Sequence, residues 1–80
     1  MTTLDRVTGV LRTVFDDPQL VVGPASTASD VDGWDSLSHV NVVIAIEAHF
    51  GIRFSQREAL GFRNVGDMVR AIDVKLAARA

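Results

Sequence analysis

The fold depends most on one stretch of sequence, GWDSLSHVNVVIAIEAHFG at residues 33–51. Its apolar residues recur at helical spacing and predict a helix from Leu37 to Phe50. Asp35 or Ser36 can cap the start of this helix, and Gly51 stands just past its end, where glycine is common. The stretch therefore places a serine hydroxyl at the beginning of a helix, in a position where another group can be attached.

This helix carries two apolar arcs when its residues are placed about 100° apart around the axis. One arc holds Val42, Ile46, His39, Phe50 and Val43, and the other holds Val40, Ile44, Leu37 and Ala48. Glu47 separates the two arcs on one side. Such a helix either buries both arcs in one core or presents one of them to a partner, and the sequence leaves both alternatives open.

The residues before this stretch predict a first helix and a long loop. The helix has an apolar stripe, can be capped by Thr2 or Thr3, and ends at Asp16-Asp17-Pro18 because a residue before proline avoids the helical conformation. Residues 16–35 are rich in turn-forming residues and include a short apolar anchor, Leu20-Val21-Val22. A loop of this length in a small domain is usually functional. The stripe consists of Leu4, Val7, Val10, Leu11, Val14 and Phe15.

The residues after this stretch predict two more helices. Ser55-Gln56-Arg57-Glu58 fits a capping box that begins a short helix ending near Gly61. Asn64 can cap the last helix, whose apolar face holds Val65, Met68, Val69, Ile72 and Leu76. No strand pattern of useful length competes, so the sequence predicts an all-α, four-helix bundle with a long first loop and a short third helix.

Length and composition limit the possible functions. Eighty residues make one domain, which is too small for a deep, enclosed active site. The chain has no cysteine, so its own side chains form no disulfides or thiolate metal sites and carry no thiol chemistry. Neither a membrane-spanning stretch nor a secretion signal is visible, so we expect a cytoplasmic protein without a membrane partner.

Charge is unevenly distributed along the chain, whose net charge is −2. Residues 13–52 contain six acidic residues and no lysine or arginine, whereas residues 53–80 contain six basic and three acidic residues. The acidic part includes Ser36, so it would steer a basic partner toward this serine and disfavours nucleic acid. Ordinary solvation of a loop is the alternative explanation.

Four motifs stand in the order and at the spacing found in acyl carrier proteins. They are Trp34-Asp35-Ser36-Leu37, Ala45-Ile46-Glu47, His49-Phe50-Gly51-Ile52 and Asn64-Val65-Gly66-Asp67. The chain resembles this family over nearly its whole length. The resemblance implies a single carrier domain over residues 1–80, a bundle of the acyl-carrier type, and a phosphopantetheine arm joined to Ser36 by a phosphodiester. The thiol of such an arm holds acyl groups as thioesters.

The resemblance also implies roles for individual residues. A phosphopantetheinyl transferase would move the arm from coenzyme A to Ser36, and Asp35 would assist it. Contacts with acyl-loading and acyl-processing enzymes are expected at Leu37, Val40, Ile44 and Glu47. An interior that shelters the acyl chain would be lined by some of Val42, Val43, Ile46 and Phe50. Trp34 is expected to anchor the loop, with contact to the arm as the alternative.

The predicted second helix is less acidic than in the housekeeping fatty-acid carriers. Neutral or weakly basic residues stand at Ser38, Asn41, Ala48 and His49, and only Asp35 and Glu47 are acidic. This difference favours a specialised carrier of a polyketide, modified-lipid or other secondary pathway. A peptidyl or aminoacyl carrier is a close alternative, although those carriers usually have glycine followed by His or Asp before the serine. An unmodified helical adaptor that only binds a partner is the alternative from another class.

Other chemistries fit the sequence poorly. A calcium loop beginning at Asp30 would have Trp34 at its fifth position and Asn41 at its twelfth, where glutamate is needed. His39 and His49 stand too far apart along one helix to share a zinc ion, and a hydrolase built on Ser36 would lack an orienting acid and an oxyanion hole. We therefore expect a carrier rather than an enzyme. Met1 and the short tail Ala77-Ala78-Arg79-Ala80 favour a stand-alone protein, expected to be a monomer.

Overall fold

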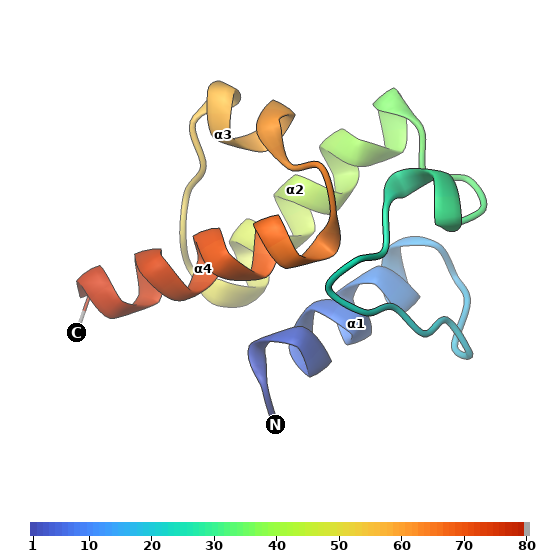
Figure 1. Ribbon diagram of the computed structural model, residues 1–80, viewed down its shortest axis with the longest axis horizontal. Helices are drawn as coiled ribbons and strands as arrows, with labels where there is room; N and C mark the ends of the chain where they lie inside the picture. Colours follow the sequence, from blue (N-terminus) through green and yellow to red (C-terminus); the bar gives the residue numbers. More distant parts are fainter. Residues whose placement is uncertain (80) are drawn as a thin grey trace.

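The computed structural model describes residues 1–79. Four α-helices and one short 3-10 helix follow one another along this part of the chain, which contains no β-strand (Figure 1). They are α1 (Thr3–Val14), η1 (Ala28–Asp30), α2 (Ser36–Phe50), α3 (Gln56–Gly61) and α4 (Val65–Arg79). The predicted all-α fold with a long first loop and a short third helix is confirmed. Ala80, the end of the tail discussed above, lies outside the described residues.

Local sequence sets where the helices begin. Thr2, and not Thr3, caps α1: its hydroxyl accepts from the Asp5 N–H at 3.1 Å, and the Asp5 carboxylate accepts from the Thr2 N–H at 3.1 Å. The capping box predicted at Ser55–Glu58 forms at the start of α3. At α4, the Asn64 side-chain oxygen accepts from a backbone N–H three residues later at 2.8 Å. These caps satisfy N–H groups that the helices themselves leave free.

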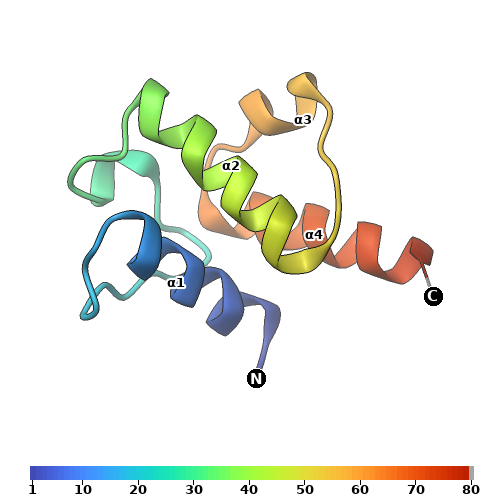
Figure 2. The same ribbon diagram turned by 180° about the vertical axis from the view of Figure 1, so that it is seen from behind.

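The core forms where α1, α2 and α4 meet, with α1 in contact with both of the other helices (Figures 1 and 2). Of the predicted anchor, Val22 is buried and Leu20 is half-buried, whereas Val21 is 78% exposed, so the anchor consists of two residues instead of three. Another loop residue, Val31, is also buried in the core. The buried apolar residues of the helices are Val7, Val10, Leu11, Val42, Ile46, Phe50, Val65, Met68 and Ile72.

The loop between α1 and α2 is tied to the start of α4. The N–H groups of Val65 and Gly66 donate to the carbonyl oxygens of Ser26 and Pro24, each at 2.8 Å. The 3-10 turn η1 within this loop was not predicted, because three residues are too few to show a periodic apolar pattern. These ties hold the loop that leads into α2 against the bundle.

The end of α2 is fixed by glycine and by α4. Gly51 adopts a left-handed conformation with φ 67°, as expected of a glycine that follows a helix. The Arg79 guanidinium donates through Nη1 to the carbonyl oxygens of Phe50 at 3.0 Å and Gly51 at 2.9 Å. Carbonyls at the end of α2 thus find a donor 28 and 29 residues away in sequence.

Candidate functional site

Ser36 is the first residue of α2, and Asp35 is its N-cap. The Asp35 carboxylate accepts from the Ser38 N–H at 2.9 Å, and the Ser38 hydroxyl accepts from the Asp35 N–H at 2.8 Å. Of the two N-caps that the sequence allowed, Asp35 is therefore correct, and an N-cap role for Ser36 is wrong. Ser36 is exposed, and within residues 1–79 its hydroxyl makes no hydrogen bond.

Two electrostatic features act at Ser36. The N-terminal end of a helix carries free N–H groups and positive partial charge, which favour a phosphate. Beside it, hydrogen bonds from the Ser38 backbone and side chain hold the pKa of the Asp35 carboxyl below its usual range. Asp35 is consequently an anion at neutral pH, one residue before the exposed hydroxyl.

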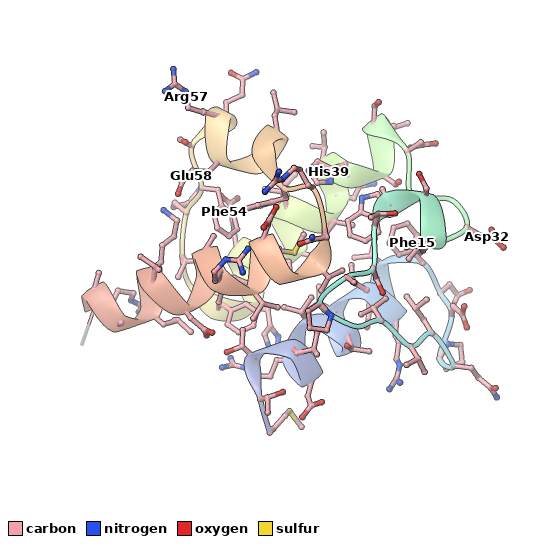
Figure 3. All side chains as sticks on the ribbon, viewed as in Figure 1. Phe15, Asp32, His39, Phe54, Arg57 and Glu58 are labelled. Atoms are coloured by element: carbon pink, nitrogen blue, oxygen red, sulfur yellow. The ribbon has the colours of Figure 1, made fainter. Side chains whose placement is uncertain are left out.

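Trp34 anchors the loop to the bundle, as expected. Its indole Nε1–H donates to His39 Nδ1 at 3.0 Å, and its ring lies 5.7 Å from the ring of Phe15, measured between centroids. Gly33 precedes it with φ 86°, a conformation that glycine adopts without strain. Figure 3 shows His39 between α2 and the segment that joins α3 to α4, and Phe15 on the side of the loop. The chain is thereby turned so that Ser36 faces outward.

A hollow of about 390 Å³ adjoins Ser36. It is lined by Ala28, Trp34, Asp35, Ser36, His39, Leu60 and Phe62, which come from the loop, α2, α3 and the segment after α3. A smaller pocket of about 70 Å³ shares Trp34 and His39 with it and continues toward Val65 and Met68. Neither is lined by Val42, Val43, Ile46 or Phe50, the residues expected to line a sheltered interior. Val42, Ile46 and Phe50 are instead buried in the core between the helices, so their expected role around an acyl chain stays a prediction.

The two arcs of α2 have different surroundings. Val42 and Ile46 are completely buried, whereas Leu37 is 79% exposed, Val40 54% and Ile44 56%. The alternative of a helix buried on both arcs is therefore wrong, and the arc that continues from Ser36 is a free apolar face. Leu60 of α3, which is 72% exposed and lines the hollow, was missed because no apolar periodicity is readable in a six-residue helix.

Glu47, also expected at the partner face, is half-buried and has an internal contact. Its Oε2 accepts from the Phe54 N–H at 2.8 Å, which fastens the segment between α2 and α3. Its expected contact with a partner enzyme stays a prediction.

Acidic residues near the site lie on the loop. Asp16, Asp17, Asp30 and Asp32 are all exposed. Figure 3 shows Asp32 pointing outward from the loop, while Arg57 points outward from α3 on the other side of the view. The exposed positions of α2 carry Ser36, Leu37, Val40, Asn41, Ile44, Ala48 and His49, so this outer face has no carboxylate. Within residues 1–79, no group of three or more His, Asp or Glu residues could hold a metal ion, and no helix is long and apolar enough to cross a membrane.

Comparison with known proteins identifies what this arrangement resembles. Residues 5–72 match the family described as "Phosphopantetheine attachment site". The acyl carrier protein of Thermosynechococcus vestitus is 39% identical over 62 residues, which cover 78% of this chain and 75% of that protein. The acyl carrier protein of Phenylobacterium zucineum is 37% identical over 76 residues, covering 94% of this chain and 95% of that one.

A solved structure shares the fold closely. The solution NMR structure of a holo acyl carrier protein from Geobacter metallireducens matches with a TM-score of 0.90 and 43% sequence identity. The match covers 99% of this chain and 91% of that one. The two proteins are therefore similar in sequence as well as in the arrangement of their helices.

Proposed function

The chain belongs to the acyl carrier proteins, whose cofactor is covalently attached phosphopantetheine, and on this premise we propose that Ser36 is its attachment residue. The observation that carries the proposal is the exposed Ser36 hydroxyl at the N-terminal end of α2. A phosphodiester at this position is favoured by the helix terminus, and the adjoining hollow offers room for the arm. Ser36 is a substrate of a transferase in this proposal, and not a catalytic nucleophile of this chain.

Attachment is a transfer of phosphopantetheine from coenzyme A. The Ser36 oxygen forms a bond to the phosphorus that bears pantetheine, the pyrophosphate bond of coenzyme A breaks, and the adenosine bisphosphate portion leaves. The hydroxyl proton passes to a base of the transferase. In this proposal, Asp35, whose carboxyl is ionised beside Ser36, interacts with the metal ion and basic surface of such an enzyme. Once bound, the arm supplies the thiol that carries acyl groups, which this cysteine-free chain lacks.

The face formed by Leu37, Val40 and Ile44 is the surface we assign to the enzymes that load and process the acyl group. Exposed apolar side chains that continue from the attachment residue suit contact with a partner surface. Because α2 presents no carboxylate on this face, partners that rely on acidic residues there are disfavoured. This supports service in a polyketide, modified-lipid or other secondary pathway.

The attachment is tested by intact-mass spectrometry. The protein is incubated with coenzyme A, Mg²⁺ and a promiscuous phosphopantetheinyl transferase, and peptide mapping then locates the added group. We expect one phosphopantetheine on wild type and none on Ser36→Ala, which keeps its helical circular dichroism because Asp35 still caps α2. Ser29→Ala, at another exposed serine of the preceding loop, is the matched control and is modified like wild type.

Three results contradict this proposal in different ways. Labelling of Ser36→Ala shows that another residue carries the arm. A wild-type chain that stays unmodified favours the unmodified adaptor. Efficient loading of an amino acid instead of an acyl group favours a peptidyl or aminoacyl carrier.

A further inference from the structure

The short helix α3 is held to the rest of the protein by few contacts. None of its six residues is buried. Outside the helix, the rings of Phe54 and Phe62 meet edge to face with centroids 5.2 Å apart. The helix itself is tied by an ion pair from Lys75 to Glu58 at 3.1 Å and by a hydrogen bond between His39 Nε2 and the Ala59 carbonyl oxygen at 2.7 Å. Of these two contacts, the hydrogen bond from His39 is the one next to Ser36, because both residues line the same hollow.

Hydrogen-bond chemistry fixes the state of His39. The Trp34 indole N–H can only donate, so His39 Nδ1, 3.0 Å away, must accept and carries no proton. The Ala59 carbonyl can only accept, so His39 Nε2 must carry the proton and donate. Both imidazole nitrogens are thus used, and one neutral tautomer joins the loop, α2 and α3.

The hydrogen-bonded pair Trp34 and His39 lines both the hollow beside Ser36 and the deeper pocket, and we call this shared lining the neck. The hollow beside Ser36, about 390 Å³, and the deeper pocket, about 70 Å³, share Ala28, Trp34, His39 and Phe62 in their linings. The deeper pocket reaches Val65 and Met68, which are fully or almost fully buried. Its volume is about half of the roughly 150 Å³ at which an apolar cavity accepts benzene. The deeper pocket is therefore too small to take a long acyl chain while α3 stays in place.

We propose that His39 is a positioning residue that holds Trp34 and α3 together at this neck, and that it thereby limits acyl cargo to groups that fit in the outer hollow. The inference rests on the proposed attachment at Ser36. Short acyl groups lie in the hollow without disturbing α3. Long chains either remain in solvent or require α3 to move away.

The first test uses the unmodified protein, so it does not depend on attachment. Amide hydrogen exchange in Gln56–Gly61 is compared between wild type and His39→Leu. Loss of both hydrogen bonds should speed this exchange about tenfold or more, equivalent to ~1.4 kcal/mol. His49→Leu changes the other histidine of α2, which lies at the far end of the helix, and should leave α3 unchanged.

Two further variants separate hydrogen bonding from packing. His39→Gln offers an acceptor and a donor, and we expect it to restore most of the slow exchange. Trp34→Phe removes the indole N–H together with part of the ring, and ¹⁵N NMR of the imidazole should then still show the Nε2–H tautomer, because the Ala59 carbonyl oxygen requires it. These two variants test whether the hydrogen bonds of His39 hold α3 in place, even if His39→Leu does not fold. Unchanged exchange in α3, or an equal effect of His49→Leu, overturns the role of His39.

The second test loads the arm with acetyl or palmitoyl groups and compares melting temperatures. Wild type should melt at the same temperature with either group, whereas His39→Leu should be stabilised by palmitoyl, because the freed α3 allows the chain to bury apolar surface. Trp34 is the only tryptophan, so a change in its fluorescence reports contact between its ring and the acyl chain. A palmitoyl-dependent gain in wild type, or none in His39→Leu despite faster exchange, overturns the cargo limit. If the transferase does not modify the chain, both the attachment at Ser36 and the cargo limit are overturned. Amide hydrogen exchange in the unmodified protein still tests whether His39 holds α3 in place.

Discussion

Two isoleucines two positions apart on α2 give the sharpest test of how this helix divides its faces. Ile46 is 0% exposed and lies in the core, whereas Ile44 is 56% exposed on the apolar face that continues from Ser36. Each is changed to alanine in turn. The removed atoms and the helix are identical, so the difference in the free energy of unfolding measures the surroundings alone.

The expected magnitudes follow from burial. Removing a fully buried isoleucine side chain down to Cβ costs about 2 to 5 kcal/mol, because transfer free energy is lost and a cavity remains. A domain of 80 residues has a free energy of unfolding of about 4 to 12 kcal/mol, so Ile46→Ala removes a large share of it. At roughly 4 to 8 °C per kcal/mol for a domain of this size, the melting temperature falls by at least about 8 °C. Ile44→Ala should change the unfolding free energy by no more than about 0.5 kcal/mol.

The assay is thermal and urea unfolding followed by circular dichroism. Val40→Ala and Val42→Ala repeat the comparison one turn earlier, with Val42 the costly position because it is 0% exposed. Equal destabilisation by Ile44→Ala and Ile46→Ala would refute the division into a core arc and a free arc. The free arc would then have to be part of the core, and its assignment to partner enzymes would be lost.

Three more predictions concern other parts of the molecule. Gly66→Ala places a Cβ 2.8 Å from the Pro24 carbonyl oxygen and should destabilise by about 1 to 3 kcal/mol, whereas Gly9→Ala, with no atom within 4 Å, should stabilise by about 0.5 to 1 kcal/mol in the same melting assay. Ile44→Asp should keep the fold and the attachment of the arm but slow turnover by acyl-processing enzymes, and loss of helical circular dichroism would instead place this residue in the core. Stability should fall in acid, because backbone N–H donors at helix starts hold four carboxyl pKa values below their usual range. Since folding lowers these pKa values, their contribution is complete above about pH 4.5 and is lost as the pH falls through the folded-state values. The four carboxyl groups are those of Asp5, Asp35, Glu58 and Asp67. Acid titration followed by circular dichroism measures the loss of stability, and a rise in stability on acidification would contradict the prediction.

Short-range patterns in the sequence were enough to predict the four helices. Caps at Thr2, Asp35, Ser55 and Asn64 act over three residues, and the left-handed Gly51 follows from glycine's lack of a Cβ. The same local chemistry placed a serine at the start of α2. The order of motifs then indicated the family before any contact was known.

Local sequence patterns could not choose between two residues, or two helix faces, that suit the same structural role. Ser36 and Asp35 are both good caps, and only the backbone geometry shows that Asp35 occupies that position. The two arcs of α2 are similarly apolar, so periodicity could not choose the buried one. That choice depends on where α1 and α4 lie.

Tertiary structure alone decided which distant groups meet. His39 reaches the Ala59 carbonyl 20 residues away, and Arg79 reaches the end of α2 across 28 and 29 residues. The sequence by itself determined the helices, the caps at Ser55 and Asn64, and the serine near the start of α2, because hydrogen bonds between near neighbours depend on a few adjacent residues. The hollow beside Ser36, the free face of α2 and the neck at His39 exist only once the helices have packed, because each is built from segments whose separation along the chain carries no information about their distance in space.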